Sequence, residues 1–183
     1  MVSRLLKSQD EKLMTVVSRE IGPNRYRESF GRYFDDFTVG DVYEHRPGRT
    51  ISEVDNTWFT LLTMNTHPVH FDQNYAADSE FGRTIVNSCL TLSVVVGMSV
   101  SDLSQKAIAN LGWDHIKLTA PVFPGDTLYA ESEVLAKRES NSRPGQGIVT
   151  AKTIGKKADG TVVMSCERSF LVPKKVQERE RDA

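Results

Sequence analysis

Two histidines that lie three residues apart are the side chains of this sequence best suited to proton transfer. His67 and His70 belong to the polar run NTHPVHFD, residues 65–72. An imidazole has an unperturbed pKa of about 6.5, so it can accept a proton at neutral pH and return it without a large shift. If the run makes a helical turn, the two rings share one face. The pair therefore indicates general acid–base chemistry.

Asp72, two residues after His70, has two interpretations. Its carboxylate can fix the tautomer of a histidine, or it can cap a helical turn over residues 74–77. His67, His70 and Asp72 are also of the types that bind metals. A metal site is disfavoured, because no third histidine or cysteine lies nearby at a suitable spacing.

Three arginines are candidates for binding a carboxylate or a phosphate. Arg83 precedes a long apolar segment, whereas Arg138 and Arg143 belong to the turn-rich run KRESNSRPGQG. Each of them taken alone is also consistent with a solvated surface position, so they are of interest as a group.

The composition limits the class of protein. The 183 residues are 39% hydrophobic, which suffices for one globular domain, and 23 basic against 24 acidic residues give a net charge of -1. This balance excludes the broad basic surface of a typical nucleic-acid-binding protein. The longest nearly apolar run, residues 90–100, is shorter than the roughly 20 residues needed to span a bilayer. Charged residues interrupt the apolar runs of the amino terminus, unlike those of a secretory signal, so we expect a soluble, cytoplasmic protein.

Three regions follow one another along the chain. Residues 1–29 are mixed and charged, with a break at Gly22-Pro23-Asn24 that ends any helix over residues 5–20. Residues 30–175 carry the regular patterns of a folded domain, and residues 176–183 form a charged tail that we expect to be disordered. Cys89 and Cys166 each lie in an apolar stretch without a CxxC partner, which predicts buried free thiols.

The domain alternates between helix-like and strand-like segments. Residues 54–64 have apolar positions at helical spacing, with Ser52 or Asp55 as cap. The run CLTLSVVVGMSVSDLSQ is apolar nearly all round, as in a helix wrapped by a sheet, and Asn87 or Ser88 caps its start. Strands are predicted at residues 42–51 (interrupted by Pro47-Gly48), 115–119, 127–137, 146–157 and 161–172, the last two joined by an Asp-Gly turn. One long buried helix followed by consecutive antiparallel strands predicts an α+β fold with a curved sheet around that helix.

Three runs in this order resemble the MaoC-like dehydratases, the hot-dog family that includes the (R)-specific enoyl-CoA hydratases. They are LTMNTHPVHFDQNYA, FGRTIVNSCLTLSVVVG and IKLTAPVFPGDTLYAESEV, and the resemblance covers roughly residues 33–172. It implies a single hot-dog domain and an enoyl-CoA hydratase or 3-hydroxyacyl-CoA dehydratase, a hydro-lyase. Coenzyme A is then part of the substrate, and no separate cofactor is expected.

The sequence departs from the family's catalytic motif, D-x-N-P-x-H-x-D, at two positions. His70 and Asp72 match it, but Asn65 stands in place of the acidic residue and His67 in place of the motif's Asn. The variant MNTHPxHFD, with VNSxLTL and SRPxxG downstream, resembles the subgroup that acts on mesaconyl-CoA or itaconyl-CoA. A short branched or dicarboxylic acyl-CoA is the substrate class that this resemblance implies.

The resemblance also implies roles for individual residues. His70 acts as the base, and the side-chain oxygen of Asn65 orients the attacking water. Either His67 supplies the second proton-transfer group, or His70 acts alone. The backbone amide of Ser88, at the start of the apolar helix, matches the family's oxyanion position; the alternative is that Asn87 and Ser88 only cap the helix.

The candidate substrate-binding residues are Asp72, Arg83, Asn87, Arg138 and Arg143. Loss of the acidic residue also favours a second function, a non-catalytic acyl-CoA-binding protein, and thioester hydrolysis is a third possibility on this fold. One hot-dog domain leaves a sheet edge exposed and an acyl tunnel incomplete, so we expect a homodimer or a higher assembly of dimers.

Overall fold

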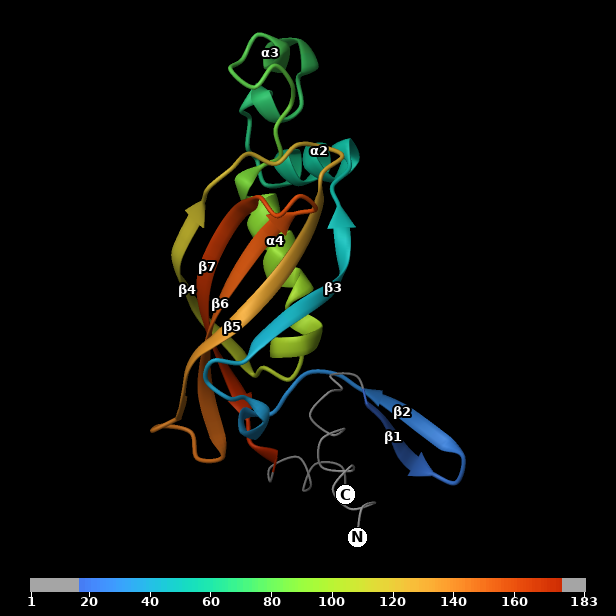
Figure 1. The fold of residues 1–183 in the computed structure, drawn as a ribbon, viewed down its shortest axis with the longest axis vertical. Coiled ribbons are helices and arrows are strands. Elements are labelled where there is room, and N and C mark those ends of the chain that lie inside the picture. The colour runs from blue at the N-terminus through green and yellow to red at the C-terminus, as the bar shows by residue number, and fades with distance from the viewer. Residues whose placement is uncertain (1–16, 176–183) are drawn as a thin grey trace.

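The computed structural model describes residues 17–175, and most of these residues build one antiparallel sheet around one helix (Figure 1). The predicted disordered tail lies outside the described residues. The five strands follow the order β3-β5-β6-β7-β4, and all neighbours run antiparallel. Their bounds are β3 Val42–Thr50, β4 Ala109–Leu118, β5 Thr127–Glu139, β6 Gln146–Lys157 and β7 Val162–Pro173.

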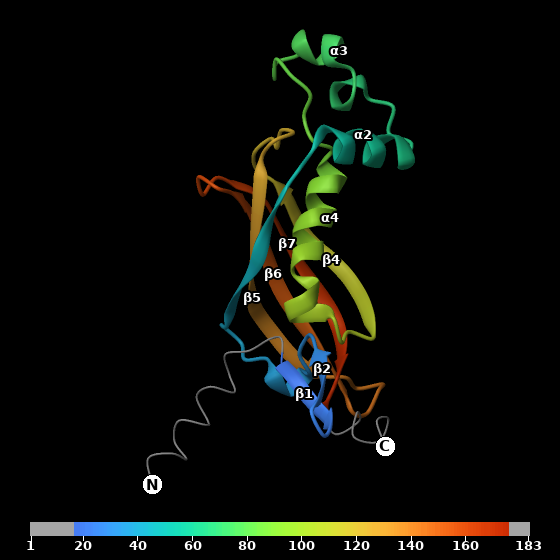
Figure 2. The same ribbon diagram turned by 90° about the vertical axis from the view of Figure 1, so that its right-hand side faces the viewer.

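Helix α4 (Ser88–Met98) lies against the inner face of the curved sheet, between β3 on one side and β4 on the other (Figure 2). Its contact with the sheet is close at Gly155 of β6, where a Cβ atom would lie 2.5 Å from a methyl carbon of Val95. A glycine is therefore required at this point for the helix to approach the strand. The predicted α+β architecture, with a curved sheet around a central helix, is confirmed.

The core consists of two apolar clusters along the sheet. One surrounds α4 and includes Leu90, Val95 and Met164, all under 8% exposed. The second lies beyond the helix, where Phe37 and Phe170 pack edge to face with ring centroids 6.0 Å apart. The apolar run that predicts α4 continues past Met98, but residues Val100–Ser104 form a π-helical turn, so the α-helix is shorter than the run.

Two strands deviate from regular geometry. The pairing of β3 with β5 shifts between His45 and Arg49, around the cis peptide Arg46-Pro47, in agreement with the predicted interruption. Strand β4 begins six residues before the predicted strand and has two register shifts in its pairing with β7. His115, beside one of these shifts, has a φ of 50°.

The described part of the amino-terminal extension is a two-stranded hairpin, β1 (Val17–Gly22) and β2 (Arg25–Ser29). Figure 1 shows it extending away from the sheet. Residues 17–20 are thus strand and not the end of a helix. No helix among residues 17–175 has both the length and the apolar content needed to cross a membrane.

The two cysteines are free but differ in environment. Cys166 is buried on β7, as predicted. Cys89 is exposed, so the prediction of a second buried thiol is wrong. The reason is its place in the first turn of α4, at the end of the sheet, where no strand covers it.

Candidate active site

The histidine segment forms a small layer of short helices beyond the end of the sheet (Figure 1). Helix α2 (Glu53–Leu62) begins at Ser52, whose hydroxyl accepts from the Asp55 amide while the Asp55 carboxylate accepts from the Ser52 amide. This capping box fixes the start of the predicted helix. The 3-10 turn η2 (Pro68–His70) and helix α3 (Gln73–Ala77) follow.

The ring of His70 is oriented by a backbone carbonyl. Its Nδ1 lies 3.0 Å from the carbonyl oxygen of Ile85. A carbonyl oxygen only accepts hydrogen bonds, so Nδ1 carries the proton. In the neutral ring, Nε2 then holds the free lone pair, which is the form that a general base requires.

The ring of His67 has the opposite tautomer. Its Nδ1 accepts a hydrogen bond from the Val69 amide at 3.3 Å, so a neutral His67 carries its proton on Nε2. The two ring centroids are 6.0 Å apart. The turn η2 therefore brings together one imidazole that can accept a proton and one that can donate a hydrogen bond.

His67 and His70 line a pocket of about 550 Å³. Tyr75 of α3 lies edge-on to His67, with centroids 6.0 Å apart, and Glu80 adds a carboxylate to the lining. The remaining lining residues are Val69, Ser79, Phe81 and Ile85. A pocket with a few polar groups among apolar walls suits a small acyl group. The sequence did not single out Tyr75 or Glu80, because only the turns around α3 bring them to the histidines.

Asn65 and Asp72 shape the backbone around this pocket. The Asn65 side-chain oxygen accepts from the His67 amide at 2.9 Å, and one Asp72 oxygen accepts from the amides of Asn74 and Tyr75 at 3.0 Å each. Asp72 is thus the N-cap of α3. Neither residue is among those that line the pocket.

The amino end of α4 follows α3 and the loop of residues 78–87 in the chain. Asn87 is its N-cap, with its side-chain oxygen 2.9 Å from the Cys89 amide, and Ser88 is the first helical residue. Helix N-termini carry unpaired N–H groups and a partial positive charge of about half a unit. Asn87 and Ser88 are not among the residues that line the pocket.

A buried asparagine that the sequence did not indicate connects these parts. Asn56 of α2 is 1% exposed. Its Nδ2 donates to the carbonyls of His70 (2.8 Å) and Ile85 (3.0 Å), and its Oδ1 accepts from the Asn87 amide (2.8 Å). The sequence shows only that Asn56 and Thr60 are four residues apart on one face of α2, and the structure buries both.

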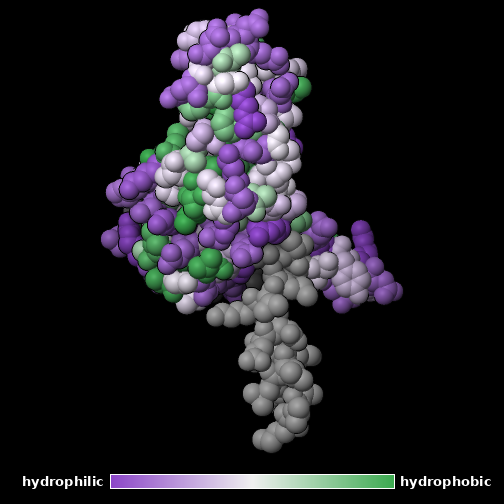
Figure 3. All heavy atoms as spheres, turned by 45° about the horizontal axis from the view of Figure 1, so that its top comes forward, coloured by the Kyte–Doolittle hydropathy of each residue, from purple (hydrophilic) through white to green (hydrophobic). Residues whose placement is uncertain are grey.

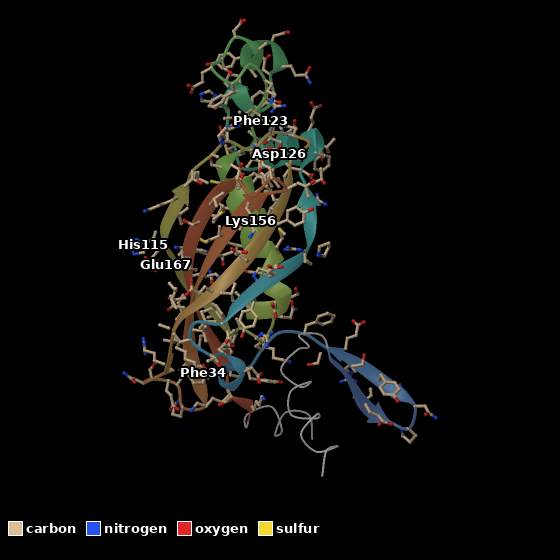
Figure 4. All side chains as sticks on the ribbon, viewed as in Figure 1. Phe34, His115, Phe123, Asp126, Lys156 and Glu167 are labelled. Atoms are coloured by element: carbon tan, nitrogen blue, oxygen red, sulfur yellow. The ribbon has the colours of Figure 1, made fainter. Side chains whose placement is uncertain are left out.

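The three candidate arginines lie in different places. The Arg83 guanidinium stacks 3.8 Å over the ring of Phe123, which Figure 4 shows at the α2 end of the sheet. Arg138 is near the far end of β5, and Arg143 lies in the connection to β6, where Gly147 contacts Phe34. Figure 4 shows Phe34 at the opposite end from Phe123.

Arg138 and Arg143 are therefore not part of the histidine site within one chain. The 13 residues of β5 rise about 3.3 Å each, so the ends of the strand are roughly 40 Å apart. Arg138 donates to the backbone carbonyl of Glu139 and is exposed. Within one chain, Arg83 is therefore the only one of the three candidate arginines near the histidine end of the sheet.

A second polar cluster is buried inside the sheet. His45 Nε2 lies 2.8 Å from the Ser132 hydroxyl, which lies 2.8 Å from the Thr153 hydroxyl, and His45 Nδ1 is 3.7 Å from the Asp102 carboxylate. Burial, followed by the Arg168 charge, lowers the pKa of His45 to about 4. Ser132 is completely buried, so no substrate reaches it, and the cluster has a structural function.

Comparison with known proteins adds to this geometry. A family profile described as mesaconyl-CoA hydratase matches residues 16–182. The mesaconyl-CoA hydratase of Cereibacter sphaeroides is 33% identical over 145 residues, 79% of this chain and 42% of that protein. A solved MaoC domain protein dehydratase from Chloroflexus aurantiacus has a TM-score of 0.75 at 32% identity, covering 79% of this chain and 41% of that one.

A protein from Mycobacterium tuberculosis with a double hot-dog fold also matches, with a TM-score of 0.73. It is 24% identical, over 79% of this chain and 45% of that one, so the likeness concerns the fold alone. The sheet around α4 is thus a single hot-dog domain. The chain spans about two fifths of the length of the mesaconyl-CoA hydratases that it matches.

Proposed function

Because this chain belongs to the mesaconyl-CoA hydratase family of MaoC-like hot-dog proteins, we propose that it is a hydro-lyase acting on enoyl thioesters of coenzyme A. Water is added across the α,β double bond or removed from the 3-hydroxyacyl product. The single observation that carries this proposal is the His70 ring, with Nδ1 bound to the Ile85 carbonyl and Nε2 free beside a pocket.

The reaction requires four contributions from the site. A base must take a proton from water as its oxygen attacks the β-carbon, and a proton must reach the α-carbon. A hydrogen-bond donor must stabilise the enolate oxygen formed between these steps, and the water itself must be oriented. His70 Nε2 is the base, because it has the free lone pair.

The tautomer of His67 favours His70 as the only proton carrier. A neutral His67 whose Nδ1 accepts from Val69 has only the Nε2 proton, and losing it would leave a strongly basic imidazolate. His67 therefore acts as a hydrogen-bond donor to the water or the thioester. The protonated His70 returns its proton to the α-carbon, so both additions take place on one face of the double bond.

The start of α4 supports the third requirement. The Ser88 amide donates to the enolate oxygen, aided by the positive end of the helix. One such donor is typically worth about 3 to 4 kcal/mol in the transition state. Asn87 contributes by capping the helix and so orienting its first amides.

A short branched dicarboxylic acyl group, as in mesaconyl-CoA, is the proposed substrate. Arg83 binds an anionic group of this substrate. Stacking on Phe123 holds the guanidinium in place, while its in-plane N–H groups remain available as donors. The anion is either the second carboxylate of the acyl group or a phosphate of coenzyme A. These two sources are separated by a prediction below.

We also propose that two copies of the chain associate. Helix α4 is apolar on nearly all sides, yet Leu92, Val94 and Val96 on it are only partly buried. On β4, Trp113 and Ile116 are each 46% exposed, and Figure 3 shows apolar side chains along that flank. A second copy would cover these surfaces.

The test is a panel of thioesters: mesaconyl-CoA, itaconyl-CoA, crotonyl-CoA and their 3-hydroxyacyl counterparts. We expect loss of the conjugated absorbance with at least one enoyl-CoA and the largest kcat/KM with a dicarboxylic one. Release of free thiol without hydration would indicate a thioesterase. Saturable binding without turnover of any thioester would indicate a non-catalytic acyl-CoA-binding protein, and either outcome would refute the hydratase.

A further inference from the structure

Asn56 uses all of its usual hydrogen-bonding groups on three backbone positions of the candidate site. Its two N–H donors face the carbonyl oxygens of His70 and Ile85, and its oxygen faces the amide of Asn87. The orientation of the amide is unambiguous, because the carbonyls can only accept and the amide can only donate. At 1% exposure, no water competes for these groups.

The three partners are the ones that matter for the proposed chemistry. The His70 carbonyl belongs to the base itself. The Ile85 carbonyl is the group that receives the ring proton of His70, so it fixes the tautomer. The Asn87 amide belongs to the N-cap of α4, one residue before the proposed oxyanion donor Ser88. One side chain therefore sets the base, its tautomer and the oxyanion end of the helix relative to one another.

We propose that Asn56 is a positioning residue for the hydration reaction, holding the lone pair of His70 and the amino end of α4 in a fixed mutual geometry. The proposal rests on the proposed function for its catalytic part. An asparagine is required because the site needs two donors and one acceptor in a plane. Aspartate would place an acceptor against two carbonyl oxygens, and an apolar residue would leave three buried backbone groups unsatisfied.

The first measurement is independent of activity. In protein labelled with ¹⁵N-histidine, the four histidines are resolved by long-range ¹⁵N–¹H correlations, and His70 is assigned from a His70 variant. We expect the Nδ1–H tautomer in the wild type, and a mixture with Nε2–H in Asn56→Asp and in the milder variant Asn56→Ser. The second variant keeps the test usable should the first fail to fold.

The second measurement is kinetic, on the thioester that the panel identifies. We expect kcat to fall about 100-fold in Asn56→Asp, the effect of misplacing a catalytic group by about 1 Å, with KM within about threefold. Ser132→Ala is the matched control, since it also removes a buried hydrogen-bonding side chain, but from the cluster around His45. It should lose stability while keeping the wild-type tautomer and kcat.

Three results would overturn the proposal. The first is a wild-type His70 tautomer in a folded Asn56 variant. The second is a kcat loss no larger than that of Ser132→Ala at equal loss of stability. The third is an Nε2–H tautomer in the wild type. If no thioester of the panel is hydrated, the proposed function fails, whereas the tautomer measurement still tests whether Asn56 positions His70.

Discussion

His67 and His70 lie with their ring centroids 6.0 Å apart and use their Nδ1 atoms in opposite senses. His67 Nδ1 accepts from a backbone amide, while His70 Nδ1 donates to a backbone carbonyl. The pair therefore presents an N–H donor and a free lone pair to the same pocket. The two rings are expected to respond differently to substitution.

Replacement of His70 by alanine removes the only group to which we assign proton transfer. We expect kcat to fall at least about 100-fold, with a smaller change in KM. His115→Asn is the matched control, because His115 is an exposed histidine on β4 and asparagine tolerates its positive φ. Turnover within a few-fold of wild type in His70→Ala, by steady-state assay, would remove His70 from its role as base.

Substitution of His67 separates hydrogen bonding from proton donation. Glutamine keeps an N–H donor but cannot transfer a proton, so His67→Gln should retain kcat within about tenfold, whereas His67→Phe should lose it about 100-fold. Equal, large losses in both variants, measured with the same thioester, would indicate that His67 exchanges a proton with the substrate.

Arg83 is predicted to bind an anionic part of the substrate. Arg83→Met keeps much of the contact with Phe123 but removes the charge, so KM should rise about tenfold or more for the substrate that carries the anion. A rise for mesaconyl-CoA but not crotonyl-CoA assigns the acyl carboxylate. A rise for both, but not for crotonyl-pantetheine, assigns a coenzyme phosphate.

The comparison variant for Arg83 is Arg138→Met, because Arg138 lies at the opposite end of β5. It should leave KM unchanged for all three thioesters. An Arg83→Met enzyme with wild-type KM throughout would show that Arg83 is an ordinary surface residue.

Self-association follows from the incompletely covered α4 and the exposed edge of β4. We expect a dimer, or a multiple of dimers, in sedimentation equilibrium at micromolar concentration. Sedimentation as a single 20.5 kDa species under these conditions would contradict this prediction.

Features set by nearby residues were predictable from the sequence. The capping box of α2 spans Ser52 to Asp55, and the N-cap of α4 acts two residues ahead, so both helix starts appear in the local pattern. Strand β6 has the predicted bounds because every second residue along it is buried. In the structure, the histidine segment follows α2 beyond one end of the sheet.

Features set by distant residues were not predictable. Asn56 bonds to residues 14, 29 and 31 positions away, so its importance depends on the packing of α2 on the histidine segment and α4. The separation of Arg138 and Arg143 from Arg83 likewise depends on the order and direction of the strands, which the sequence around each arginine does not contain. The prediction that Cys89 is buried was wrong for the same reason. Because α4 is apolar on nearly all sides, its sequence does not show which of its ends the sheet leaves uncovered.

The buried His45 makes stability depend on pH in a defined direction. Its pKa is about 4 in the folded protein, mainly through burial, against 6.5 when exposed. Below pH 6.5 the unfolded chain therefore binds a proton that the folded chain does not. Stability from this residue is complete above pH 6.5 and is lost as the pH falls towards 4. The groups facing the ring are Asp102, Arg168, Arg46 and Glu131.

The loss attributable to His45 between pH 7 and pH 5 is about 2 kcal/mol, since one pKa unit corresponds to about 1.4 kcal/mol. The free energy of unfolding is measured by urea titration at both pH values. We expect it to fall between pH 7 and pH 5 by about 2 kcal/mol more in the wild type than in His45→Gln. Glutamine does not titrate but can still bond to Ser132. Carboxylates elsewhere affect both proteins equally and cancel in the difference. Parallel declines in the two proteins would show that His45 is accessible to protons in the folded state, in conflict with its 3% exposure.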